Sequence, residues 1–216
     1  MFSDNLLENL DSVTMMSEEE IRHEHHGRSS KGFLDSEKIL KDIGIKDGDR
    51  FLDLGSGEGY FSIAASQALG KDGIVYAFDA DQDSISRLHR EIAEKKLANI
   101  KASVVDITKE LPLPDENINL VFMSNVLHGL LANSEADSTF KEIARVTAYN
   151  GRLAVVEFKK QESPHGPPLS IRLNPEDVET LAMAYGFLKE SIQEAGPYHY
   201  VILLRKRWIT TEQSHV

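Results

Sequence analysis

The chain has 216 residues, contains no cysteine and carries a formal net charge of −11 at pH 7. This length suits one domain, which buries roughly 70% of the surface that the unfolded chain exposes. Hydrophobic residues make up 41% and charged residues 27%, which is typical of a globular protein and argues against a disordered or fibrous chain. The lack of cysteine excludes disulfides, thiolate metal sites and cysteine nucleophiles.

Charge and hydropathy also indicate which partners and locations the sequence disfavours. A net charge of −11 repels a phosphate backbone, and the short basic run is confined to residues 205–207, so we predict no nucleic-acid partner. No apolar run approaches the roughly 20 residues that cross a bilayer. Residues 1–9 lack the pattern of a signal peptide. We therefore expect a cytoplasmic protein without a membrane span, and we keep a homodimer open.

The predicted elements begin after an N-terminal segment of a different character. Residues 6–16 have the pattern of an amphipathic helix, and a polar stretch bearing several histidines follows them. We predict an arm or lid over residues 1–34 and the main domain over residues 35–216.

From Asp35 onward, short apolar runs alternate with segments of helical spacing. This alternation predicts an α/β domain whose parallel strands are joined by right-handed crossovers. The predicted strands are 50–54, 74–79, 100–105, 118–124 and 152–157, and the predicted helices are 58–69, 83–97 and 134–147.

The pattern changes after Glu157. A proline-rich loop spans residues 164–168, and residues 175–185 have helical spacing. Residues 187–193 and 198–206 then read as two strands joined by a tight turn at Gly196 and Pro197. We therefore predict one antiparallel strand in an otherwise parallel sheet.

A glycine-rich turn joins the first predicted strand to the first predicted helix, with the sequence LDLGSGEGY over residues 52–60. Glycines in this position let the backbone approach a bound ligand. A dinucleotide-binding turn has a third glycine where this chain has Tyr60. Asp53 and Glu58 place negative charge where a pyrophosphate would lie, so a ligand carrying an ammonium and a sulfonium is favoured over a dinucleotide.

Two carboxylates follow the next strands. Asp79 ends the second predicted strand, where it either accepts hydrogen bonds from both hydroxyls of a ribose or caps the following turn. Asp106 follows the third predicted strand, where it either reaches an adenine amino group or remains a solvated loop residue. Asp81 and Asp83 are interpreted as turn and cap residues.

Further motifs follow in a characteristic order. They are VYAFD at 75–79, VD at 105–106, LPLPD at 111–115, NVLH at 125–128, and EIARV at 142–146 leading to NGRL at 150–153. Together with the glycine turn, they resemble the class I S-adenosylmethionine-dependent methyltransferases, especially the small-molecule branch typified by ubiquinone and menaquinone C-methyltransferases. The similarity runs from about residue 35 to residue 206.

The resemblance implies a Rossmann-like, seven-stranded, mostly parallel sheet with helices on both faces and the last strand antiparallel between its neighbours. It also implies S-adenosylmethionine as cofactor and a small-molecule acceptor. Carried over by position, Asp53, Gly55 and Gly57 face the methionine portion of the cofactor, with Ser56 and Tyr60 in the same turn. Asp79 faces the ribose, Ala80 the adenine ring, Asp106 and Ile107 the adenine edge, and Asn125 the methionine side near the methyl group.

Two positions depart from the branch. Asn119 stands where an aspartate is usual, and Tyr149-Asn150-Gly151 replaces a proline-glycine-glycine turn. The arsenite-methylating relatives bind the metalloid through cysteines, so the absence of cysteine argues against that activity.

Methyl transfer is an in-line displacement, so alignment and water exclusion are the main tasks of the protein, and a base is needed only if the acceptor loses a proton. The candidate catalytic residues are His128 and Glu157, which follow the fourth strand and end the fifth. The alternatives are that His128 packs at a helix start and that Glu157 pairs with Lys159.

Other histidines remain without an assigned role. His23, Glu24, His25 and His26 are dense enough to suggest a metal site, but their spacing matches no metal signature, so we predict no metal. His165 either lines the acceptor site or is an exposed loop residue.

Two other functions compete with a methyltransferase. One is a non-catalytic S-adenosylmethionine-binding or regulatory protein on the same fold. The other is a nicotinamide oxidoreductase, against which Tyr60 and Asp53 argue.

Overall fold

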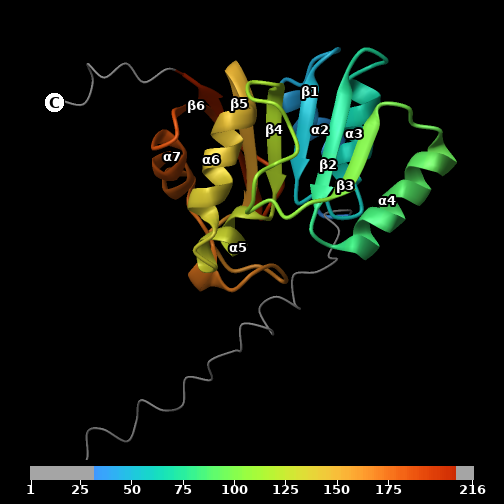
Figure 1. Cartoon of the computed structure of the whole chain (residues 1–216). Coiled ribbons are helices and arrows are strands. Elements are labelled where there is room, and N and C mark those ends of the chain that lie inside the picture. The colour runs from blue at the N-terminus through green and yellow to red at the C-terminus, as the bar shows by residue number, and fades with distance from the viewer. Residues whose placement is uncertain (1–31, 208–216) are drawn as a thin grey trace, which may run out of the picture.

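A computed structural model describes residues 32–207 of the chain. Within this range the strands form one seven-stranded sheet in the order β3-β2-β1-β4-β5-β7-β6 (Figure 1). The strands are β1 (Arg50–Leu54), β2 (Ile74–Asp79), β3 (Ile100–Val104), β4 (Ile118–Ser124), β5 (Thr147–Phe158), β6 (Phe187–Glu194) and β7 (His199–Lys206). The helices are α2 (Ser36–Asp42), α3 (Tyr60–Ala68), α4 (Gln82–Lys95), α5 (Leu127–Ala132), α6 (Ala136–Val146) and α7 (Pro175–Met183), with a 3₁₀ turn η1 (Leu169–Ile171).

The strand directions confirm the predicted sheet. All neighbouring pairs from β3 to β5 are parallel, whereas β7 is antiparallel to both β5 and β6. β1 lies between β2 and β4, so the chain leaves it toward one half of the sheet and later returns to fill the other half. In open α/β sheets, ligands bind outside the carboxyl ends of the strands at this reversal point.

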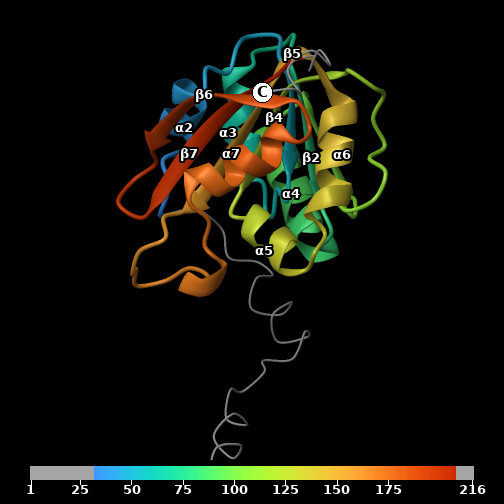
Figure 2. The same cartoon turned by 90° about the vertical axis from the view of Figure 1, so that its left-hand side faces the viewer.

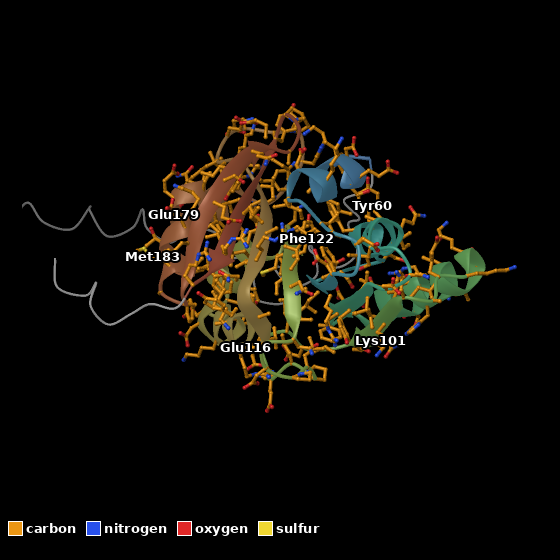
Figure 3. The ribbon with its side chains drawn as sticks, turned by 90° about the horizontal axis from the view of Figure 1, so that it is seen from above. Tyr60, Lys101, Glu116, Phe122, Glu179 and Met183 are labelled. Carbon is orange, nitrogen blue, oxygen red and sulfur yellow. The ribbon has the colours of Figure 1, made fainter. Side chains whose placement is uncertain are left out.

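Helices lie on both faces of the sheet (Figure 2), and a hydrophobic core fills the space under each set of helices. One core joins α5, α6 and α7 to alternate strand residues such as Leu52 and Val121. The other joins α2, α3 and α4 to the opposite set, which includes Phe51 and Phe122. Figure 3 looks down on the sheet, with Phe122 of β4 between Tyr60 on one side and Met183 of α7 on the other. Because both faces are covered, the exposed backbone edge at the carboxyl ends of the strands is where a ligand can reach the sheet.

Most predicted boundaries agree with the structure, and the differences have local causes. The helix expected from Glu58 begins at Tyr60, because Gly59 adopts a left-handed conformation with φ of +82° at the N-cap. β5 starts at Thr147 rather than Arg152, and its pairing with β4 shifts register between Ile118 and Leu120. The 149–151 segment is therefore part of a strand and not a turn.

Two short helices lie outside the helix ranges predicted from the sequence. α2 has 7 residues and is capped by Asp35, whose side chain accepts a hydrogen bond from the Lys38 backbone N–H. α5 has 6 residues and has no side-chain cap. Both are too short for a clear periodic pattern, and packing on the sheet stabilises them instead.

Parts of the predicted organisation fall outside the described range. The proposed arm, with its histidine cluster at residues 23–26, lies almost entirely before residue 32. Across residues 32–207, no helix has the length and apolarity needed to cross a membrane.

Candidate functional site

The glycine turn, α5 and the loop after β5 all lie at the carboxyl edge of the sheet, at the lower side of Figures 1 and 2. The turn leaves β1, α5 follows β4, and the loop leads from β5 to η1, which contacts α5. The predicted site residues come from these connections, so the topology gathers at one edge residues that are far apart in the sequence.

The glycine turn is held open by backbone hydrogen bonds. The N–H groups of Gly55 and Ser56 both donate to the Phe78 carbonyl, at 2.8 and 3.0 Å. A Cβ on Gly55 would lie 2.4 Å from Val126, so this glycine is required by packing against the start of α5. A Cβ on Gly57 would meet nothing within 4 Å, although its φ is +52°. Gly57 therefore faces open space, as a residue that contacts a ligand would.

Asp79 ties the second strand to this turn. One carboxylate oxygen accepts a hydrogen bond from the Gly57 N–H at 2.7 Å, and the other accepts from the Asp81 N–H at 2.8 Å. Each carboxylate oxygen has a second lone pair, so the group retains acceptor capacity. Asp81 caps α4, as predicted, by accepting a hydrogen bond from the Ser84 N–H.

Asp53 is the buried carboxyl group of the site, with only 2% of its surface exposed. Burial raises the pKa of Asp53 to about 7, the Ser62 hydroxyl that donates to it at 2.6 Å opposes this shift, and the negative charge of Asp79 adds to it. Glu58, the other acidic residue of the turn, pairs with Arg87 of α4 at 2.7 Å. A cation bound near Asp53 would compensate a carboxylate that the protein itself leaves without a basic partner within 4.0 Å in residues 32–207.

Three buried polar side-chain atoms near the turn have no hydrogen-bond partner within the described chain. They are the hydroxyl oxygens of Ser56 and Ser124 and the amide oxygen of Asn125. Asn125 also has a positive φ of +59°, which asparagine tolerates better than most residues. Buried polar groups are almost always paired in native proteins, so this group at the ends of β1 and β4 indicates a polar ligand.

The residues predicted to contact adenine lie beside the end of β3. Ala80 and Asp106 are exposed, while Ile107 is buried. One oxygen of Asp106 accepts hydrogen bonds from the hydroxyl and the N–H of Thr108, at 2.6 and 3.0 Å, and the hydroxyl bond lowers the pKa of Asp106. The structure therefore brings these residues to the same edge as Asp79 but engages Asp106 in a local turn.

Tyr60 makes a contact that the sequence did not suggest. Its hydroxyl donates a hydrogen bond to the Leu34 carbonyl at 2.6 Å. The first described residues thus cross the start of α3, next to the glycine turn. Because the hydroxyl is engaged in this bond, the predicted contact of Tyr60 with the cofactor would be made by its ring.

His128 and Glu157 form a buried pair. The Nδ1 atom of His128 lies 2.8 Å from one Glu157 oxygen, and the His128 backbone N–H donates to the other at 3.1 Å. The two residues are 4% and 1% exposed. The expected alternative pairing of Glu157 with Lys159 is wrong, because Lys159 pairs with Glu194. Glu157 therefore fixes the orientation of the imidazole at the start of α5.

The site suits a ligand with a cationic part and a polar, hydroxyl-bearing part. Asp53 and Asp79 supply the acidic groups, and Ser56, Ser124 and Asn125 supply the unpaired polar atoms. Ser62 and Ser124 were not predicted from the sequence. Each is a small polar residue among the buried positions of a helix or strand, and this pattern could have indicated them.

Known proteins share this architecture. A family model described as a methyltransferase domain matches residues 45–196. A solved S-adenosylmethionine-dependent methyltransferase from Aquifex aeolicus is 26% identical, has a TM-score of 0.75, and is matched over 88% of this chain and 98% of its own.

Curated relatives agree at the level of the family. The ubiquinone/menaquinone biosynthesis C-methyltransferase UbiE of Neisseria meningitidis serogroup B is 31% identical over 163 residues, which are 69% of this chain and 61% of the relative. An arsenite methyltransferase of Halobacterium salinarum is 30% identical over 152 residues, but the match spans 69% of this chain and only 37% of the relative. Together with the fold and the polar groups at the carboxyl edge of the sheet, these similarities show that the chain belongs to the class I S-adenosylmethionine-dependent methyltransferase family.

Proposed function

We propose that this protein transfers the methyl group of S-adenosylmethionine to a small-molecule acceptor. The observation that carries the proposal is the set of unpaired polar atoms of Ser56, Ser124 and Asn125 at the ends of β1 and β4, the strand pair that also holds the buried Asp53. A buried polar group without a partner costs free energy that a bound ligand recovers. When bound, S-adenosylmethionine supplies an activated methyl group on a sulfonium.

The residues of the turn hold the methionine portion in this proposal. Asp53 compensates its positive charge, Gly57 lets it approach the backbone, and Asn125 holds the side near the methyl group. Gly55, Ser56 and Tyr60 complete this part of the site. Asp79 binds the ribose hydroxyls, while Ala80, Asp106 and Ile107 surround the adenine.

His128 and Glu157 act on the acceptor. Glu157 holds Nδ1 of His128 at 2.8 Å, so the opposite edge of the imidazole has a fixed direction. An oriented imidazole can align an acceptor group and remove its proton as the new bond to carbon forms. Burial of the pair keeps water away from the imidazole and from the carboxylate that orients it.

Cofactor binding tests the proposal directly. We expect calorimetry to detect S-adenosylmethionine binding by the full chain, and Asp79→Asn to weaken it at least about tenfold, because hydrogen bonds to a charged group contribute about 1.5–3 kcal/mol. Asp83→Asn, on an exposed residue in the first turn of α4, removes the same charge and should change the affinity less than about twofold. Tight binding of NADH in place of S-adenosylmethionine would refute the proposal.

Turnover assays test which acceptor the protein methylates. Release of S-adenosylhomocysteine can be followed with a panel of phenols, carboxylic acids and amines. We expect His128→Gln to lower turnover of any active acceptor at least about tenfold, the usual contribution of general base catalysis being larger still. Cofactor affinity should stay within about twofold. Equal turnover in the variant would remove His128 from the chemistry.

We also propose that the protein works in the cytoplasm without nucleic acid and allow for a homodimer. The net charge of −11, which repels a phosphate backbone, supports the absence of a nucleic-acid partner. Leu188 and Ile192 on the edge strand β6, which are 47% and 42% exposed, offer apolar surface for a homodimer. Light scattering distinguishes a 24.2 kDa monomer from a particle of twice that mass.

A further inference from the structure

A second group of buried polar residues lies at the carboxyl edge, beyond the cofactor residues. His199 begins β7 and pairs with Phe158 at the end of β5. Their ring centroids are 3.9 Å apart. The guanidinium carbon of Arg172 lies 5.0 Å from the centroid of the same Phe158 ring. We call Phe158, His165, Arg172 and His199 the Arg172–His199 cluster.

Arg172 is a buried cation without an acidic partner. It is 5% exposed, and no carboxylate between residues 32 and 207 lies within 4.0 Å of it. Four backbone carbonyls accept hydrogen bonds from its guanidinium at 2.5 to 3.5 Å, and an arginine has five N–H donors. These carbonyls belong to Lys159, Gln161, His165 and Pro167.

Two other arginines that are at least partly buried have carboxylate partners. Arg145 pairs with Asp115 and Glu142, and Arg152 lies 3.4 Å from Asp49. Buried charges in proteins are normally paired, because an uncompensated charge is costly to remove from water. Of the two buried arginines in residues 32–207, Arg152 and Arg172, Arg172 is therefore the one whose positive charge has no carboxylate within 4.0 Å.

His199 adds an unused hydrogen-bonding atom next to this charge. The residue is 3% exposed, and its Nε2 atom is buried without a partner in the described chain. Burial lowers the pKa of His199 to about 4, and the charge of Arg172 lowers it further in the same direction. The imidazole is thus neutral near pH 7, and in the tautomer with hydrogen on Nε2 it donates one hydrogen bond.

The cluster has a more open side and a position close to the proposed chemistry. Phe33 is 53% exposed, and its ring lies 4.4 Å from the half-buried ring of His165. The 3₁₀ turn η1, which directly precedes Arg172, contacts α5, the helix whose first turn carries His128. Phe158 follows Glu157 at the end of β5 but faces the other side of the sheet, because successive side chains of a strand alternate. The cluster and the His128–Glu157 pair therefore lie on the two sides of the carboxyl end of β5.

We propose that the Arg172–His199 cluster binds an anionic oxygen group of the methyl acceptor, such as a carboxylate. The positive charge of Arg172 compensates the anion, and Nε2 of His199 donates a hydrogen bond to it. This inference rests on the proposed methyltransferase function and narrows its substrate class to acceptors that carry a negative charge.

Benzoate and benzamide provide matched probes, since they differ in charge and little in shape. Each is titrated into the full chain by calorimetry, with and without S-adenosylhomocysteine. We expect benzoate to bind at least about tenfold more tightly than benzamide, because hydrogen bonds to a charged group are roughly twice as strong as neutral ones. His199→Phe keeps the ring against Phe158 and should remove this preference.

Two further variants complete the design. Arg172→Met should also weaken benzoate binding at least about tenfold, and Arg90→Met, on an exposed residue of α4, removes the same charge without effect. If Arg172→Met does not fold, His199→Phe decides alone. Equal binding of the two probes, no binding of either, or an unchanged preference in His199→Phe would overturn the inference. Loss of S-adenosylhomocysteine binding alone would instead count against the proposed function.

Discussion

Asp53 illustrates how one buried side chain links the fold to the ligand. Its carboxyl group is 2% exposed beside a second acidic residue, Asp79, and the protein offers it one hydroxyl donor from Ser62. An isolated buried carboxylate is costly, and here burial raises the pKa to about 7. The folded protein therefore holds this group half protonated near neutral pH, ready to ionise when a cation binds.

The affinity for S-adenosylmethionine should consequently depend on pH. As the pH rises from 6 to 8 through the pKa of about 7, Asp53 ionises and attracts the cationic ligand, so we expect the affinity to increase several-fold. Asp53→Asn should weaken binding at pH 8 and flatten this dependence. Calorimetry across this pH range provides the measurement, and an unchanged slope in the variant would rule out Asp53 as its source.

His199 has the opposite electrostatic behaviour. Its pKa falls from 6.5 in the unfolded chain to about 4 in the fold, so between these values the unfolded state binds more protons than the native state. The free energy of unfolding must then rise with pH across this window and fall as the pH drops from 6.5 toward 4. We expect His199→Phe to lose less stability than the wild type between pH 7 and pH 5 in denaturant titrations. An identical loss in both proteins would contradict the buried, neutral state of His199.

At the scale of elements, the connection from β3 to β4 depends on one arginine of α6. Arg145 donates hydrogen bonds to the carbonyls of Leu111 and Leu113 at 3.0 and 2.8 Å, and it pairs with Glu142 and Asp115. Glu142 in turn accepts a hydrogen bond from the Leu111 N–H at 2.7 Å. This network holds the loop that follows Asp106, one of the residues proposed to surround the adenine, against the helix.

Removal of the Arg145 guanidinium should lower the stability of the fold. We expect Arg145→Met to lower the free energy of unfolding by about 2–4 kcal/mol, because it leaves carbonyls and Glu142 without their charged donor. Lys141→Met is the matched control on the same helix. It breaks an exposed pair with Asp137 and should cost no more than about 0.5 kcal/mol. Similar losses in the two variants would show that the network does not stabilise the fold.

At the scale of the whole molecule, the two hydrophobic cores meet at one sheet, and the residues proposed to bind the cofactor follow or end its middle strands. A ligand bound there contacts connections from both halves of the sheet. Its binding free energy therefore adds to the stability of the whole domain and not of one segment.

We accordingly expect a clear thermal shift. S-adenosylmethionine at 100 times its dissociation constant should add about 2.7 kcal/mol, which raises Tm by about 5–10 °C for a domain of this size. NADH at the same concentration should raise Tm by less than about 1 °C, because its pyrophosphate meets the acidic turn. A larger shift with NADH would reverse the ligand assignment.

The sequence by itself determined the sheet, the glycine turn and the family. Strands buried on both faces are continuous apolar runs, so β1, β2 and β4 were predicted to the residue. The polar residues at or near the carboxyl ends of these strands were recognisable because parallel strands bring those ends to one edge. Asp53, Asp79 and Asn125 could thus be proposed before any contact was known.

Only the tertiary structure decided which side chains meet. The pairing of His128 with Glu157 joins residues 29 apart, and the placement of His199 beside Arg172 depends on the antiparallel β7. The short helices α2 and α5 were outside the predicted helix ranges, because their stability comes from packing and not from local propensity. Burial, which sets the pKa of Asp53 and leaves Arg172 without a carboxylate, is a property of the whole fold and has no signature in a linear sequence.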